Sequence, residues 1–275
     1  MNDSALLSHA AATSKARDSS ATWTPFRKPR PQAAIRLLCF PHAGGAALAY
    51  RGWNELLPDF IEVCPIQLPG RGNRAYETPF TSVSAMLNAL LPAIAPLLDR
   101  PIALFGHSMG AALAFATAQA LEQRGVTVTR LFTSGRRPPL AAYSNALHRK
   151  NDAELTAYLR DLGGTPDMVF EDADLMEMVF RLLRADFELN GQYVAQHSLR
   201  TVPISALGGS HDPVVPTEAL SDWSLLTQAG FDSTVFEGGH FFLQPQEAKV
   251  IRHLTDRIKA DLVNANMHQR LARHG

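Results

Sequence analysis

Short apolar runs alternate with stretches of helical periodicity along most of the chain. The apolar runs are flanked by Gly or Pro and are typical of buried β-strands. They lie at residues 35–40, 61–68, 101–105, 129–134, 202–207 and 233–236. The helical stretches lie between and after them, at residues 53–57, 82–98, 109–124, 218–228 and 246–263. Strands that alternate with helices in this way predict an α/β fold with a mostly parallel central sheet flanked by helices.

The alternation lapses between residues 138 and 200, where only helical patterns occur, at 152–162 and 172–194. A helical insertion between two strands of such a sheet is expected to form a lid above the carboxyl edge of the strands. Asp172 or Asp174 can cap the second lid helix. The apolar stripe of that helix is expected at Leu175, Met178, Val179, Leu182 and Leu183.

The two ends of the chain differ from the middle. Residues 1–33 are rich in Ser, Ala and Thr and then become basic and proline-punctuated, so we expect a flexible N-terminal leader. Residues 264–275 are polar and basic and are expected to fray. The folded domain is therefore predicted at residues 34–263.

A serine lies at the sharpest predicted turn. Gly106-x-Ser108-x-Gly110 follows the strand at 101–105 and opens the helix at 109–124. A strand, a tight turn and a helix around this pattern are the context of a nucleophile elbow, which lifts a serine Oγ clear of the sheet. Gly106 and Gly110 would let the two backbones approach closely. The alternative is a Gly/Ser-rich loop without chemistry, and the pentapeptide alone does not decide between the two.

A serine hydroxyl needs a base within hydrogen-bond reach and a third group to orient that base. Asp212 and His240 each follow a predicted strand, at the same sheet edge as Ser108. The order Ser108, Asp212, His240 is the one that α/β-hydrolases use. Other residues considered for the acid are Asp186, Asp222, Asp232 and Glu237, and for the base His42, His107, His211 and His253.

The remaining parts of a serine hydrolase also have candidates. The backbone N–H groups of Ala43, in the turn Pro41-His-Ala-Gly-Gly45, and of Met109 are expected to form the oxyanion hole. These groups predict acyl transfer to water without a metal or cofactor. Some lid side chains are either core packing or an adaptable surface for an acyl chain. They are Met168, Phe170, Met176, Met178 and Phe180.

The composition of the chain mainly excludes classes of protein. The formal net charge is zero, which gives no support to nucleic-acid binding. No apolar run has the length of about 18 residues that a membrane span needs. Cys39 and Cys64 lie in apolar strand-like runs and are interpreted as buried thiols in a reducing compartment. We therefore expect a cytoplasmic protein that acts as a monomer, without membrane or nucleic-acid partners.

Seven motifs together resemble a known family. They are Leu38-Cys-Phe-Pro-His-Ala-Gly-Gly45, Gln67-Leu-Pro-Gly-Arg-Gly72, Phe105-Gly-His-Ser-Met-Gly110, Ser134-Gly-Arg-Arg137, Leu183-Arg-Ala-Asp-Phe187, Gly208-x-x-x-Asp212 and Gly239-His-Phe-Phe242. The chain is similar over about residues 34–260 to the type II thioesterases of polyketide and nonribosomal peptide synthetases, which have the α/β-hydrolase fold. The resemblance implies hydrolysis of stalled or misprimed acyl groups from the phosphopantetheine arm of acyl or peptidyl carrier proteins.

Carrier proteins are commonly acidic and their arm carries a phosphate, so loop arginines are candidates for docking. They are Arg71, Arg74, Arg136 and Arg137, and each is equally well interpreted as a solvated loop residue. Three other functions stay open at this point. The chain could be a carboxylesterase or lipase-like enzyme acting on free esters, a medium-chain acyl-carrier-protein hydrolase of fatty acid synthesis, or a non-catalytic member of the fold.

Overall fold

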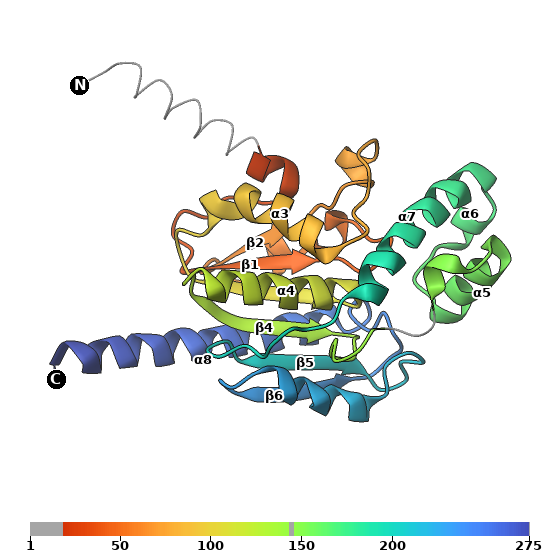
Figure 1. Ribbon diagram of the computed structural model, residues 1–275. Coiled ribbons are helices and arrows are strands. Elements are labelled where there is room, and N and C mark those ends of the chain that lie inside the picture. The colour runs from red at the N-terminus through yellow and green to blue at the C-terminus, as the bar shows by residue number, and fades with distance from the viewer. Residues whose placement is uncertain (1–18, 143–145, 275) are drawn as a thin grey trace, which may run out of the picture.

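The computed structural model describes residues 19–142 and 146–274 and contains one parallel sheet (Figure 1). The strand order is β2-β1-β3-β4-β5-β6, and every neighbouring pair is parallel. The strands are β1 (Ile35–Phe40), β2 (Ile61–Pro65), β3 (Ile102–His107), β4 (Val128–Ser134), β5 (Ile204–Gly209) and β6 (Phe231–Phe236). The α/β fold with a mostly parallel sheet is thus confirmed.

Helices cover both faces of the sheet. The α-helices are α2 (Trp53–Leu56), α3 (Val83–Ile94), α4 (Met109–Gln123), α5 (Asp152–Leu162), α6 (Asp167–Phe170), α7 (Ala173–Gln192) and α8 (Glu247–His274). Short 3₁₀ helices are η1 (Ala47–Tyr50), η2 (Gly72–Arg74), η3 (Ala95–Leu97), η4 (Leu147–Arg149) and η5 (Thr217–Leu226). The helix expected at 218–228 is therefore a 3₁₀ helix. None of the helices in the described ranges is long and apolar enough to cross a bilayer.

The pleat of the strands divides the core into two. In β1, Leu38 and Phe40 pack against α3 and α4 on one face, whereas Ile35, Leu37 and Cys39 pack against α2 and α8 on the other. Successive side chains of a strand point to opposite faces, so a strand buried on both sides is apolar throughout. This is why β1 is apolar at every position except Arg36, which is buried in an ion pair with Glu62 of β2. Cys39 and Cys64 are buried free thiols, as expected.

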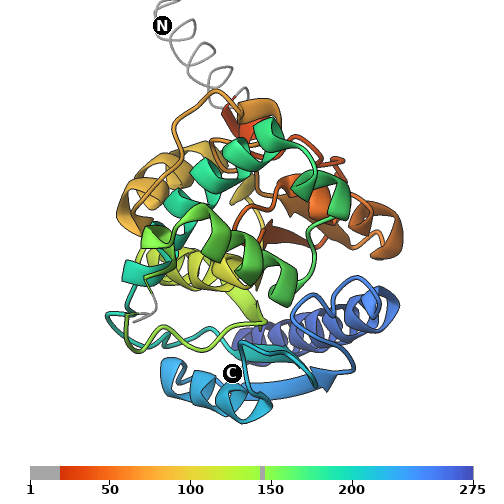
Figure 2. The same cartoon turned by 90° about the vertical axis from the view of Figure 1, so that its right-hand side faces the viewer.

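The insertion after β4 forms a small helical layer at the carboxyl edge of the sheet (Figure 2). Helices α5, α6 and α7 pack around their own cluster of Leu155, Leu159, Met176, Phe180, Leu183 and Phe187. Asp172 caps α7, because its carboxylate accepts hydrogen bonds from the N–H groups of Asp174 and Leu175. The predicted stripe is partly wrong, since Leu175 is 43% and Met178 is 55% exposed.

Both ends are more ordered than the sequence suggested. Residues 1–18 lie outside the described residues, but 19–33 pack on the domain instead of forming a flexible leader. Trp23 is 4% exposed and stacks on Phe80, and Arg27 pairs with Glu62. At the other end α8 continues to His274. The end expected at residue 263 was wrong, because polar composition alone does not stop a helix and there is no Gly or Pro between 247 and 274.

Candidate active site

Ser108 lies at the turn between β3 and α4. Its backbone φ is 54° and ψ is −120°, a conformation that non-glycine residues rarely adopt and that costs about 1–3 kcal/mol. Its N–H donates to the carbonyl of Ser134 at 2.8 Å, which fixes the turn to the end of β4. Strained backbone of this kind is typical of functional sites. The predicted nucleophile elbow is present in its backbone geometry.

The two elbow glycines are needed for close approach. A Cβ on Gly106 would lie 2.0 Å from the carbonyl oxygen of Gly110. A Cβ on Gly110 would lie 2.1 Å from the carbonyl oxygen of Phe40, at the end of β1. Real side chains do not tolerate such distances, so both positions require glycine. The start of α4 can therefore press against the ends of β1 and β3.

Asp212 and His240 form a hydrogen-bonded pair. The imidazole Nδ1 of His240 lies 2.8 Å from Oδ2 of Asp212, and both side chains are buried. The other carboxyl oxygen accepts from the N–H groups of Val214 and Val215, at 2.8 and 3.2 Å. The carboxylate of Asp212 accepts hydrogen bonds on both oxygens, so the ring nitrogen that faces it, Nδ1 of His240, is the one that carries a proton. Nε2 is left as the acceptor nitrogen of the ring.

The other acids and bases considered have different surroundings. Asp232 pairs with Arg130 at the opposite edge of the sheet, and Asp222 is exposed on η5. His211 bonds the neighbouring Ser210, and His253 packs between aromatic rings of the second core. None of these residues is bonded to His240.

Ser108 and His240 line the same two cavities, together with Ala43. The smaller cavity, of about 50 Å³, extends past Arg136 and Asn190. The larger one, of about 220 Å³, extends beneath the lid helices. Ser108, His240 and Ala43 therefore open onto a common space with two arms.

The arm of about 220 Å³ is mainly apolar, but its lining differs from the predicted chamber. Its apolar wall includes Leu159, Leu162, Val169, Val179, Leu183 and Phe187. None of the five predicted residues lines it: Met168 and Met178 are exposed, Phe170 lies under the guanidinium of Arg160, and Met176 and Phe180 pack inside the lid. For the three residues on α7 the prediction was wrong because apolar side chains occur around most of the circumference of that helix.

The turn Pro41–Gly45, predicted to supply an oxyanion donor, carries Ala43, which lines the same cavity as Ser108, while Met109 is the first residue of α4. His42 packs edge-on against Phe241, with ring centroids 5.0 Å apart. Burial and the nearby His240 lower the pKa of His42 to about 4. Burial, followed by the neighbouring His240 and His42, lowers the pKa of His107 well below its ordinary value. Both rings are therefore neutral partners of the site near pH 7.

Two of the four predicted docking arginines are buried and engaged. Arg71 forms a bidentate pair with Asp186, and Arg74 forms one with Glu77 while its guanidinium lies over the ring of Trp23. A docking role does not fit either of them. Arg136 is 2% exposed and donates to the side chain of Asn190, so it faces the site and not a protein partner. Arg137 is exposed.

Sequence reasoning gave no role to several residues at the site. Asp186 was considered only as a rival for Asp212, yet it is buried and accepts from Arg71 and from the N–H of Gly44. The signal was present, because Asp186 belongs to the motif Leu183-Arg-Ala-Asp-Phe187. Leu159 and Asn190 had only their helical positions to mark them, and these say nothing about which face meets the cavity.

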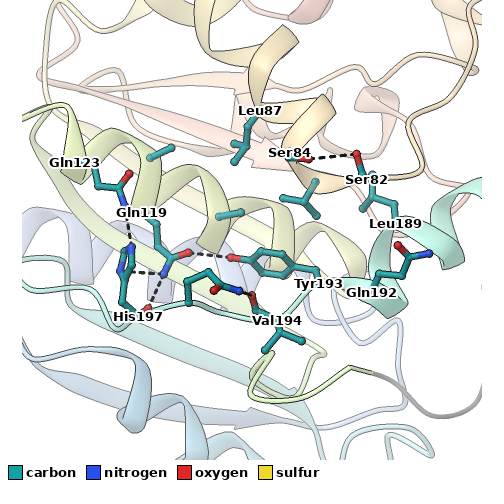
Figure 3. A pocket seen from close by; sticks show the side chains of 14 residues that line it. Ser82, Ser84, Leu87, Gln119, Gln123, Leu189, Gln192, Tyr193, Val194 and His197 are labelled. Carbon is teal, nitrogen blue, oxygen red and sulfur yellow. Dashed lines mark hydrogen bonds between the residues drawn. The ribbon is translucent and has the colours of Figure 1, made fainter.

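A further hollow lies away from Ser108. Its volume is about 700 Å³ and it is bordered by α3, α4 and the segment after α7 (Figure 3). Its polar groups bond one another: Tyr193 donates to Gln119, and Gln119 and Gln123 contact His197. Within the described ranges, no group of three His, Cys, Asp or Glu residues is close enough to hold a metal ion.

Comparisons with known proteins agree with this geometry. The thioesterase domain family matches residues 35–258. Linear gramicidin dehydrogenase LgrE of Brevibacillus parabrevis is 37% identical over 255 residues, covering 90% of this chain and 97% of the relative. Thioesterase PikA5 of Streptomyces venezuelae is 35% identical over 242 residues, covering 87% and 86%. The solved type II thioesterase BorB, from the borrelidin biosynthetic cluster, has a TM-score of 0.76 and 35% identity, covering 84% of this chain and 95% of that one. This chain belongs to the thioesterase family, and within it to the type II thioesterases.

Proposed function

We propose that Ser108, His240 and Asp212 act as a catalytic triad that hydrolyses acyl thioesters held on the phosphopantetheine arm of carrier proteins. The observation that carries the proposal is the strained elbow serine opening onto the same cavity as a histidine whose Nδ1 is bonded to a buried aspartate. This arrangement supplies a nucleophile, a base and an orienting acid in the chain order of α/β-hydrolases.

The reaction proceeds in two acyl transfers. Ser108 Oγ attacks the thioester carbonyl while Nε2 of His240 takes its proton, and the oxyanion is stabilised by the N–H groups of Ala43 and Met109. His240 then gives this proton to the sulfur of the arm, which leaves as the thiol, and the acyl group stays on Ser108. Water then attacks the acyl-enzyme with His240 again as base, which releases the acid and restores Ser108. No metal or cofactor enters either transfer.

The substrate class is supported by the relatives and by the cavity. BorB is a type II thioesterase of a biosynthetic cluster, and the apolar arm of about 220 Å³ beside Ser108 suits an acyl group. Removal of stalled or misprimed units from a polyketide or nonribosomal peptide synthetase is the corresponding role. LgrE is named a dehydrogenase. Here the matching family is the thioesterases, and β3 leads into Gly-x-Ser-x-Gly, unlike the Gly-x-Gly-x-x-Gly loop of dinucleotide-binding folds.

Carrier proteins are the proposed partners, and Arg137 is the one exposed member of the four arginines assigned to docking. Arg136 is proposed to contact the arm or the acyl group inside the smaller cavity. A cytoplasmic location and a monomeric state stay predictions from the sequence.

The decisive experiment is intact-protein mass spectrometry of acyl-loaded carrier proteins before and after incubation with the enzyme. The expected result is loss of the acyl mass with the parent protein and retention with Ser108→Ala, whose turnover falls by several orders of magnitude. A second comparison separates a thioesterase from a carboxylesterase. It measures the turnover of acyl thioesters of N-acetylcysteamine and of the matching oxygen esters of its alcohol analogue. Faster turnover of the oxygen ester would favour a carboxylesterase, and turnover by Ser108→Ala would refute the triad.

A further inference from the structure

The carboxylate of Asp186 connects the lid to the loop that carries Ala43. Its Oδ2 accepts from the N–H of Gly44 at 2.7 Å and from Nη1 of Arg71 at 2.8 Å. Its Oδ1 accepts from Nη2 of Arg71 at 2.7 Å. Both side chains are almost fully buried, at 2% and 4% exposed. The proposed hydrolysis gives neither residue a chemical step.

The pair holds the loop from two directions. Arg71 donates to the carbonyl of Gly45 at 3.2 Å, while Asp186 accepts from the N–H of Gly44. Gly44 has a φ of 75°, a left-handed conformation that favours glycine. A glycine-rich loop has many accessible conformations, so fixing a donor on it requires contacts of this kind.

The held peptide group is the neighbour of the oxyanion donor. The peptide bond between Ala43 and Gly44 is planar, so a hydrogen bond to the N–H of Gly44 fixes the orientation of that whole plane. Only the two backbone dihedrals of Ala43 then separate this plane from the N–H of Ala43. If Asp186 releases Gly44, the plane can turn and the N–H of Ala43 turns with it.

The same contact anchors α7. One helical turn beyond Asp186, the side chain of Asn190 accepts from Nη1 of Arg136, which lines the smaller cavity. Phe187 lies between these two anchors and lines both cavities with Ser108. Bidentate arginine–carboxylate pairs are among the strongest and most directional polar contacts in proteins. The C-terminal half of α7 is thus a fixed wall of the site.

We propose that Asp186 is a positioning residue: with Arg71 it holds the Ala43 N–H in the orientation that the oxyanion requires, and it makes that orientation depend on the seating of α7. The inference rests on the proposed acyl hydrolysis through its use of an oxyanion hole. It does not depend on which acyl donor is the substrate.

The test compares Asp186→Asn with the parent protein on p-nitrophenyl acetate and with phenylboronic acid, which adds to Ser108 and places an anionic oxygen in the oxyanion hole. The expected kcat is roughly 10- to 100-fold lower, somewhat less than the loss of a whole oxyanion donor. KM should change less than about twofold, because ground-state binding does not use the oxyanion contact. The Ki of the boronic acid should rise by a factor similar to the loss in kcat.

Asp261→Asn is the matched control. Asp261 forms a bidentate pair with the buried Arg130, at the start of β4 and far from the carboxyl edge. Loss of this ion pair in Asp261→Asn should lower the melting temperature and leave kcat and Ki unchanged. If Asp186→Asn does not fold, Arg71→Lys keeps the charge balance of the pair and loses the fork geometry, and it should show the same proportional change in kcat and Ki.

The proposal is overturned if Asp186→Asn or Arg71→Lys loses thermal stability while kcat and Ki stay at parent values, or if KM alone rises. Failure of the proposed function has a different signature. In that case the parent protein leaves carrier-bound thioesters intact, whereas boronic acid binding still reports on Asp186 without any turnover.

Discussion

Asp212 combines burial with a full set of hydrogen bonds. One oxygen accepts from two backbone N–H groups and the other faces Nδ1 of His240. These contacts fix the orientation of the carboxylate without help from solvent. A residue held in this way determines which nitrogen of the histidine carries the proton, and hence whether Nε2 can act as base.

Asp212→Asn should therefore lower kcat by roughly 10³- to 10⁴-fold with little change in KM, because an amide NH₂ facing Nδ1 favours the wrong tautomer. The measurement is steady-state hydrolysis of an acyl N-acetylcysteamine thioester near pH 7.5. Asp222→Asn is the control, since this exposed acid on η5 was a rival from sequence. Comparable losses in the two variants would count against the assignment of Asp212.

The three residues of the proposed triad could be named from sequence because each follows a predicted strand at one sheet edge. Their local context carried the information. The arginines are different: Arg71 and Arg137 both lie in loops after strands, yet one is buried against Asp186 and the other is exposed. Whether a loop residue is buried depends on which distant element covers it. The element that covers Arg71 is α7, which begins more than 100 residues further along the chain, so the local sequence around Arg71 gives no sign of it.

At the scale of elements, helix α7 shows where periodicity stops being informative. Leu175, Met176, Met178, Val179 and Phe180 are apolar within a single turn and a half. A stripe on such a helix can be drawn along several faces, and only tertiary packing decides between them. The helix itself and its Asp172 cap were predicted correctly, whereas the face that meets the cavity was not.

Val179→Phe should narrow the apolar arm and shift the preference toward short acyl groups. Val179 lines this cavity of about 220 Å³, and a phenyl ring there occupies space that a longer chain would need. We expect kcat/KM for an octanoyl thioester to fall at least about tenfold relative to an acetyl thioester. Met178→Phe is the control, because Met178 is exposed on the same helix. Equal effects of the two substitutions would contradict the assignment of this face.

At the scale of the whole molecule, residues 19–33 belong to the domain. Trp23 is buried, and the guanidinium of Arg30 donates to the carbonyls of Leu57, Pro58 and Ile61. Composition alone predicted a leader, because one tryptophan among polar residues and prolines gives no periodic signal. The contacts that order the segment are made to positions about 30 to 60 residues further along.

A chain that begins at Ala34 should be less stable than one that begins at Ser19. Loss of a buried tryptophan typically costs about 3–5 kcal/mol, which corresponds to a melting temperature lower by roughly 10 °C in a domain of this size. Thermal unfolding followed by circular dichroism measures the difference. The chain that begins at Ser19 is itself shortened but keeps the packed segment, so the difference between the two melting temperatures reports on residues 19–33 alone. Identical melting temperatures would mean that the packed segment does not contribute to stability.

The stability of the folded protein should fall at acid pH because of the two neutral histidines at the site, His42 and His107. In the unfolded chain a histidine binds a proton below about pH 6.5, whereas burial lowers the pKa of His42 to about 4 and that of His107 well below its ordinary value. The unfolded state therefore binds more protons than the folded state as the pH falls from about 6.5 toward 4, and the free energy of unfolding decreases by up to about 1.4 kcal/mol per pH unit for each group.

His107→Asn should remove one such contribution, while the asparagine amide can still bond Ser134 near the position of Nδ1. Urea unfolding between pH 7 and 4.5 should give a shallower pH slope for this variant than for the parent or for His211→Gln, whose histidine is exposed. An unchanged slope in His107→Asn would show that His107 takes up its proton in the folded state.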